Sequence, residues 1–141
     1  MGYKLGVFIR QQEDWKDRNV TWEVAKHLLQ KDDLEIFLID YCHPYNAPLF
    51  DGDLNHVFKA VQITNAENFG TLPAPDKDLT IDDFDFLWLR IGPPTPMSFF
   101  KALRDRDQQT TPIILNNPAG ILELDNKSFL PSLKDSLGEF L

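Results

Sequence analysis

The sequence predicts an α/β fold with an open, mainly parallel sheet flanked by helices and carrying an inserted β-hairpin. Short apolar runs of strand length alternate with segments whose apolar residues recur every three or four positions. The most continuous run, 84–89, is rich in aromatic residues, which is typical of a strand buried on both faces. Because no linker divides the chain, residues 1–141 are expected to form a single domain.

The first third of the chain predicts a strand at 4–9, a helix at 21–30 and a second strand at 34–39. Within the helical segment, Trp22 and Ala25 fall on one face at the spacing of an amphipathic helix. A strand, helix and strand in so few residues predict two parallel strands joined by a crossover connection.

Residues 47–63 predict an antiparallel hairpin inserted into the otherwise parallel sheet. The pair Asp51-Gly52 is a strong turn signal, and it stands between the apolar residues 47–50 and the segment 54–63. Because the apolar residues of 54–63 alternate imperfectly, the turn signal carries most of this prediction.

The second half predicts the central strand at 85–90, a helix at 95–107 and a short strand at 112–115. The segment Gly92-Pro93-Pro94 must end the central strand, because proline lacks the amide hydrogen and restricts the residue before it. We therefore expect a rigid structural loop at Gly92, Pro93 and Pro94.

Polar residues follow each of the four expected parallel strands: Arg10, Asp40, Arg90 and Asn116. The carboxyl ends of parallel strands share one edge of the sheet, and ligands of open α/β sheets bind there. Arginine can receive a carboxylate through two hydrogen bonds, so Arg90 and Arg10 are candidate substrate-binding residues. For Arg90 a second interpretation stays open, namely an ion pair with one of the aspartates just upstream.

Motifs for metals and for nucleotide phosphates are not found. The sequence has no GxxxxGK[ST] and no GxGxxG. His27, His43 and His56 share no ligand spacing with one another or with Cys42, so no metal site is predicted. We expect Cys42 to be a half-buried, inert thiol.

The bulk composition limits the partners. A formal net charge of −8 argues against nucleic acid or an anionic membrane surface as the main partner, since both attract basic proteins. With one cysteine the chain can form no internal disulfide, and no apolar run has the length of a signal peptide or a membrane helix. A cytoplasmic protein is expected.

Three motifs carry a family resemblance. The first, Arg90 with Pro93 and Pro94, lies in LWLRIGPP, which a predicted helix follows. The other two, Asn116 with Pro118 and Lys127 with Phe129, lie in PIILNNPAGILELDNKSF. In this order they resemble the N-terminal domain of the bacterial glutathione synthetases, a Rossmann-like pre-ATP-grasp domain. The residues that match the family pattern are Arg90, Pro93, Pro94, Asn116, Pro118, Lys127 and Phe129. The sequence departs from the family at Asn117, where a lysine is usual, and at Leu122, where an arginine is usual.

The resemblance implies a role in joining γ-glutamylcysteine to glycine with ATP and Mg²⁺. This domain would bind the small peptide substrate through Arg90, with hydrogen bonds from Asn116. Lys127 would approach the ATP phosphates, and Pro118 would shape a structural loop. The partners implied are the ATP-grasp domains, absent from this chain, and a second copy in a homo-oligomer. The chain alone is then expected to be inactive. The alternative is a freestanding, non-catalytic binding or dimerisation module.

Overall fold

The computed structural model describes residues 2–10, 15, 20–64, 72–91, 95–106, 112–115 and 118. Their strands are β1 (Tyr3–Ile9), β2 (Leu34–Asp40), β3 (Phe58–Ile63), β4 (Lys77–Leu79), β5 (Phe86–Leu89) and β6 (Ile113–Leu115). Their helices are α1 (Val20–Leu28), α2 (Ala47–Phe50) and α3 (Met97–Asp105), with two short 3₁₀ turns, η2 (Pro44–Asn46) and η4 (Ile81–Asp83).

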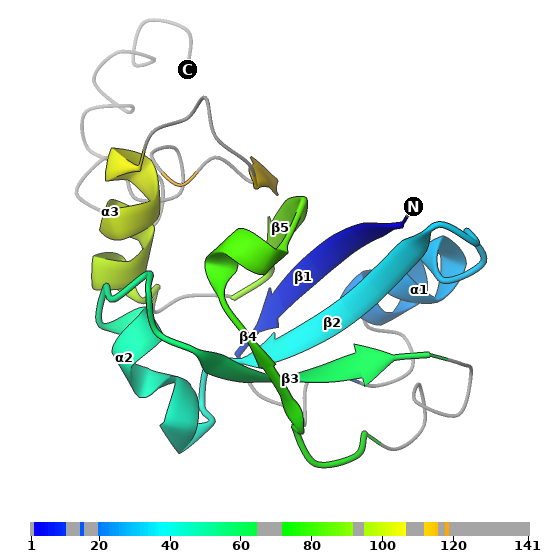
Figure 1. Ribbon diagram of the computed structural model, residues 1–141, viewed down its shortest axis with the longest axis horizontal. Helices are drawn as coiled ribbons and strands as arrows, with labels where there is room; N and C mark the ends of the chain where they lie inside the picture. Colours follow the sequence, from blue (N-terminus) through cyan, green and yellow to red (C-terminus); the bar gives the residue numbers. More distant parts are fainter. Residues whose placement is uncertain are drawn as a thin grey trace, which may run out of the picture.

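The strands form one open, mixed sheet in the order β4-β3-β2-β1-β5-β6 (Figure 1). The pairings β1–β2, β1–β5 and β5–β6 are parallel. The pairings β2–β3 and β3–β4 are antiparallel. The four strands expected from the sequence near 4–9, 34–39, 85–90 and 112–115 are therefore confirmed, and so is the parallel arrangement of the first two.

The hairpin expected at 47–63 is wrong. Residues 47–50 form α2, and β3 pairs instead with β4, which lies beyond residue 64. The cause is local: Pro44 opens η2, where the His43 ring accepts a hydrogen bond from the Tyr45 amide, and Pro48 lies in the first turn of α2. Proline suits a first helical turn but cannot donate to a strand ladder.

The Asp51-Gly52 pair ends α2 rather than turning a hairpin. Gly52 has a φ of 111°, in the region that favours glycine, and its amide donates to the Leu49 carbonyl. The signal for a change of chain direction was correct, but the element before it is a helix.

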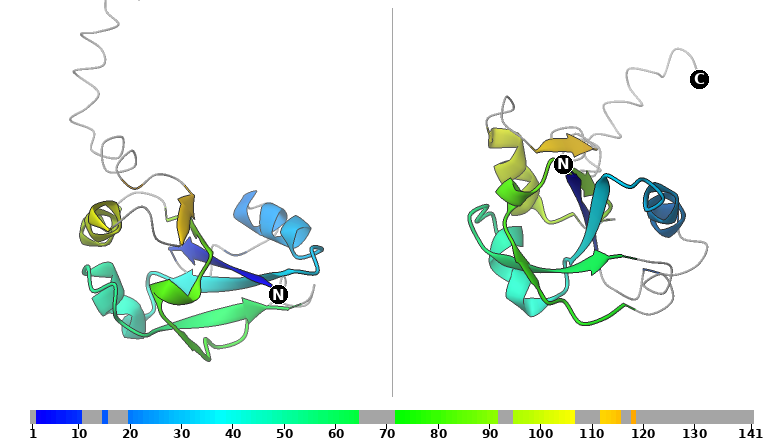
Figure 2. Two further views of the ribbon diagram at one scale, coloured as in Figure 1. Left: turned by 45° about the horizontal axis from the view of Figure 1, so that its top comes forward. Right: turned by 45° about the vertical axis from the view of Figure 1, so that its right-hand side comes forward.

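Helices cover both faces of the sheet, with α1 on one face and α2 and α3 on the other (Figure 2). The side chains of β1 alternate between the two cores. Leu5, Val7 and Ile9 pack on the α1 side, and Phe8 packs on the α2 and α3 side. The strand β1 is thus buried on both faces. The sequence predicted this of 84–89 instead, where Leu87 and Leu89 of β5 are buried but Phe86 and Trp88 are only half-buried.

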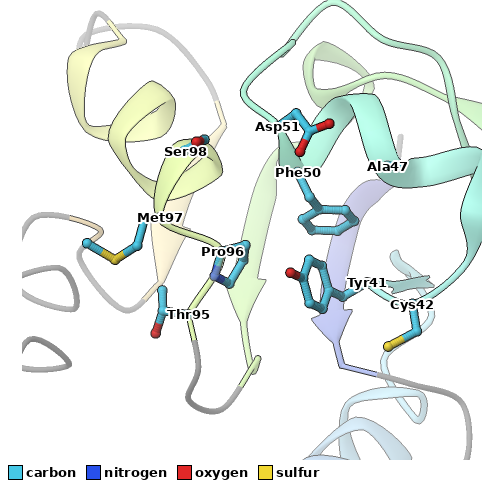
Figure 3. Close-up of a pocket in the computed structure, with 9 residues that line it drawn as sticks. All are labelled: Tyr41, Cys42, Ala47, Phe50, Asp51, Thr95, Pro96, Met97 and Ser98. Atoms are coloured by element: carbon cyan, nitrogen blue, oxygen red, sulfur yellow. The ribbon is translucent and has the colours of Figure 1, made fainter.

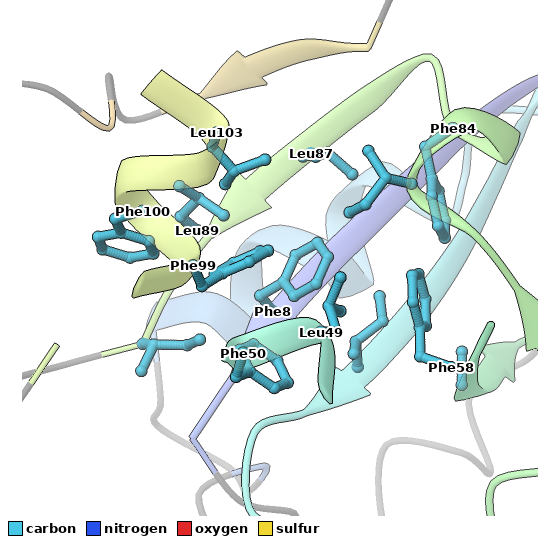
Figure 4. Close-up of a cluster of buried hydrophobic side chains, with 14 of the residues drawn as sticks. Phe8, Leu49, Phe50, Phe58, Phe84, Leu87, Leu89, Phe99, Phe100 and Leu103 are labelled. Atoms are coloured by element: carbon cyan, nitrogen blue, oxygen red, sulfur yellow. The ribbon is translucent and has the colours of Figure 1, made fainter. Parts of the chain in front are cut away.

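Phenylalanine fills much of the α2 and α3 side (Figure 4). The ring centroid of Phe8 lies 6.2 Å from that of Phe50 and 5.4 Å from that of Phe99. Gly6 on β1 makes room for Phe84, since a Cβ atom there would lie 3.1 Å from Phe84 Cε1. This core fixes α2 and α3 on one face of the sheet.

No helix within the described part of the chain is both long and apolar enough to cross a membrane.

Candidate functional site

The candidate site is the carboxyl edge of β1, β2 and β5, the three parallel strands at the centre of the sheet. Ile9 pairs with Asp40 at the end of β2, and Arg10 follows directly. On the other side, Phe8 pairs with Leu89 at the end of β5, and Arg90 follows. The parallel pairing therefore brings Arg10, Asp40 and Arg90 to one edge, as the sequence predicts.

The chain changes direction across the sheet at β1. From β1 it passes through α1 to β2 on one side, whereas β5 lies on the other side and leads through α3 to β6. The helices that follow β1 and β5 along the chain, α1 and α3, cover opposite faces of the sheet. Such a switch point is where open α/β sheets bind ligands, and Arg10 and Arg90 follow the two strands that define it.

Arg90 is exposed and held in place by two neighbours. Its Nε donates a hydrogen bond of 2.9 Å to the hydroxyl of Thr21 on α1. Its guanidinium carbon lies 5.4 Å from the centroid of the Trp88 ring. Such a cation–π contact contributes about 0.5–1 kcal/mol at an exposed position. The guanidinium is therefore oriented, while no carboxylate among the described residues pairs with it.

The alternative of an ion pair between Arg90 and the upstream aspartates is wrong. Asp82 pairs with Arg106, Asp83 accepts from the Thr80 amide at 2.7 Å, and Asp85 accepts from the Lys4 amide at 2.8 Å. These aspartates precede β5, so the length of the strand separates them from its carboxyl end. Their contacts stabilise the chain around the amino end of β5.

Arg10 lies on the opposite face of the sheet from Arg90. Its guanidinium carbon is 5.4 Å from the centroid of the Tyr41 ring, and Tyr41 packs against the α2 and α3 core. Arg90 instead contacts Thr21 and Trp88 on the α1 face. The two arginines lie at the same edge of the sheet. Arg10 lies on the α2 and α3 face, and Arg90 lies on the α1 face.

Asp40 is engaged by the chain that follows it. Its carboxylate accepts a hydrogen bond of 2.7 Å from the Cys42 amide, and its carbonyl accepts one from Asn46 at 3.0 Å. These bonds fix the turn after β2. Cys42 itself is exposed, so the expectation of a half-buried thiol is wrong.

The other residues predicted for the site or its loops are Asn116, Lys127, Gly92, Pro93, Pro94 and Pro118. Pro118 is described and buried. The positions Asn116, Lys127, Gly92, Pro93 and Pro94 lie outside the described residues, so their predicted roles stay predictions. Within the described ranges, no group of three or more His, Cys, Asp or Glu side chains could hold a metal ion.

A pocket of about 530 Å³ lies beside this edge, on the α2 and α3 face (Figure 3). Its walls come from the turn after β2, from α2 and from the start of α3, and the lining residues are Tyr41, Cys42, Ala47, Phe50, Asp51, Thr95, Pro96, Met97 and Ser98. Sequence reasoning missed it because it depends on α2, which the sequence predicted as a strand. The available signal was the pair of prolines, Pro44 and Pro48, around the start of that helix.

Comparison with known protein families found none that matches the chain. No curated protein matches it either.

Proposed function

We propose that the chain is the substrate-binding domain of a glutathione synthetase-like ligase, built on a Rossmann-like pre-ATP-grasp fold. In this function the domain holds γ-glutamylcysteine while ATP and Mg²⁺ drive its joining to glycine. The observation that carries the proposal is the exposed, oriented guanidinium of Arg90 at the switch point of the sheet. The order of the three sequence motifs supports it.

The geometry around Arg90 suits a carboxylate. Thr21 engages Nε, and no hydrogen bond from the two terminal nitrogens of the guanidinium is seen among the described residues. A planar guanidinium offers paired N–H groups that match the two oxygens of a carboxylate, and lysine cannot copy this arrangement. The peptide substrate carries such groups. Holding it in one orientation is the contribution this domain would make to the reaction.

ATP and Mg²⁺ belong to the ATP-grasp domains in this proposal. The described residues offer no cluster of carboxylates for the metal, so no step of the chemistry is assigned to them. Lys127 would meet the ATP phosphates and Asn116 would add a hydrogen bond to the peptide. On this basis the chain alone binds substrate but does not turn it over.

The experiment is a titration of the chain with γ-glutamylcysteine, followed by calorimetry or by nuclear magnetic resonance. Arg90→Lys should weaken binding about tenfold, the scale of a lost hydrogen bond to a charged group, and leave the melting temperature nearly unchanged. Arg104→Lys is the matched control, because Arg104 is an exposed arginine on α3 that pairs with its neighbour Asp105. If Arg90→Lys unfolds the chain, or binds as the wild type does, Arg90 is not the substrate contact.

A second candidate function is a dimerisation module, in which the partner is a second copy of the chain. Exposed apolar side chains favour it: Ile113 and Leu115 on the edge strand β6 are 57% and 43% exposed, and Tyr3 on β1 is 51% exposed. Sedimentation at increasing concentration separates the candidates. A dimer that Ile113→Lys converts to a monomer, with no binding of γ-glutamylcysteine, would favour this one.

A further inference from the structure

We propose that the pocket between α2 and the start of α3 binds a small organic cation, an amine carried on an apolar or aromatic body. This site differs from the one proposed for the peptide substrate, because Arg90 lies on the other face of the sheet. The proposal therefore does not depend on the ligase function.

The negative charge on the pocket wall favours a ligand with a positive charge. Among the described residues that line the pocket, Asp51 is the one with a charged side chain. Within the described residues, no cation pairs with its carboxylate. Arg10 lies over the Tyr41 ring and is not among the lining residues. An ammonium group placed beside Asp51 gains a charged hydrogen bond, whereas a carboxylate there meets like charge.

Aromatic rings stand beside this carboxylate. The Phe50 ring meets the Tyr41 ring edge-on, at 4.9 Å between centroids and 82° between planes, which fixes both rings at the pocket wall. Figure 3 shows Asp51 and Phe50 close together, with Pro96 and Met97 on the facing side. The half-buried Tyr41 ring and the apolar surfaces of Pro96 and Met97 suit the apolar or aromatic body of the ligand.

The walls of the pocket are held at a fixed separation by the fold. Gly52, directly after Asp51, packs against the start of α3, where a Cβ atom would lie in van der Waals contact at 3.4 Å from the Ser98 carbonyl oxygen. Phe50 also packs on Phe99 of α3, at 4.9 Å between ring centroids. The pocket is therefore preformed, and its volume of about 530 Å³ lies within the range of about 300–1,000 Å³ that small-molecule sites occupy.

The chain carries a reporter for this pocket. Cys42 is the single cysteine of the sequence, it is exposed, and it lines the pocket. A ligand that occupies the pocket must slow the reaction of this thiol with a small alkylating reagent. The rate of that reaction then measures occupancy at one defined position.

The experiment compares three probes of one shape: phenethylammonium, phenethyl alcohol and hydrocinnamate, which are cationic, neutral and anionic. Phenethylammonium should slow the alkylation of Cys42 at lower concentration than the other two. Asp51→Asn should weaken this protection about threefold to fivefold, the scale of an exposed charge pair, and salt should do the same. Asp53→Asn is the matched control, since Asp53 is an exposed aspartate of the same loop that does not line the pocket.

The comparison among probes in the wild-type chain decides the matter without any variant. Equal protection by hydrocinnamate, or no protection by phenethylammonium at millimolar concentration, would overturn the proposal. So would protection that Asp51→Asn leaves unchanged or that Asp53→Asn reduces equally.

Discussion

At the scale of the residue, Asn46 shows how one buried amide joins separate parts of the chain. It is fully buried, and its side chain donates to the carbonyls of Asp40 and Lys59 at 3.0 and 3.2 Å. Its side-chain oxygen accepts from the Lys59 amide at 2.8 Å. Asn46 thereby ties the turn after β2, which forms one wall of the pocket, to β3. Nothing in the composition of residues 40–50 singles it out, because this role depends on Lys59 thirteen residues away.

Asn46→Ala should lower the free energy of unfolding by about 2–3 kcal/mol, because it leaves the part-buried Lys59 amide and the carbonyls of Asp40 and Lys59 without their partner. Denaturant unfolding measures this loss. Asn46→Asp should be at least as damaging, since a carboxylate accepts from the Lys59 amide but cannot donate to the carbonyls. Asn55→Ala is the control. Because Asn55 is exposed, its substitution should lower the free energy of unfolding only slightly. A loss for Asn46→Ala no larger than that of Asn55→Ala would contradict the assigned role.

At the scale of the element, β1 is a strand that its neighbours pack against closely. It pairs with β2 and β5 and contributes side chains to both cores. The sequence identified β1 as a buried strand from its apolar residues. The reason for a glycine in its middle appears only with the packing, because Gly6 lies under Phe84 from the turn before β5.

Gly6→Ala should reduce stability by about 1–3 kcal/mol, the usual cost of an overpacked core. The added Cβ would meet Phe84 Cδ1 at 3.2 Å and Leu87 Cδ2 at 3.3 Å, and both side chains are buried. Unfolding by denaturant measures the change.

A double-mutant cycle isolates the steric contact in the Gly6→Ala variant. Leu87→Val removes part of the volume that the new methyl group would meet. The two substitutions together should therefore cost less than the sum of the separate losses. Additive losses would show that the space around Gly6 is not limited by Leu87.

A salt bridge between β3 and the edge strand β4 is a weaker interaction between elements. Lys59 on β3 lies opposite Asp78 on β4, and the two side chains form a salt bridge. The hydrogen bond to Asp78 raises the pKa of Lys59, and the Asp78 charge acts in the same direction. Because both side chains are partly exposed, the pair specifies the pairing of β4 more than it adds stability.

At the scale of the whole molecule, the sheet has a buried centre and two different edges. At one edge β4 carries the charged residues Lys77 and Asp78, which discourage pairing with another chain. At the other edge β6 carries the exposed apolar residues Ile113 and Leu115. The centre, β1, is covered on both faces and hydrogen-bonded on both sides.

Amide hydrogen exchange should be slowest at the centre of the sheet and faster at its edge. The amides of β1, with Val7 and Phe8 fully buried, should exchange most slowly, and those of β4 much faster, because the centre opens only when the domain unfolds. Exchange measured by nuclear magnetic resonance and corrected for intrinsic rates tests this. Protection of β4 equal to that of β1 would mean that the whole sheet opens as one unit.

The sequence by itself determined the central strands, the helices α1 and α3, and the polar ends of the strands, because burial periodicity and proline placement are local properties. Only the tertiary structure decided that residues 47–50 form a helix, which the core stabilises through Leu49 and Phe50. The tertiary structure alone also decided that β3 pairs with β4, which follows it after a long connection. The register Phe8–Leu89 likewise placed Arg10 and Arg90 on opposite faces, because side chains alternate along strands and only the pairing fixes which ones share a face.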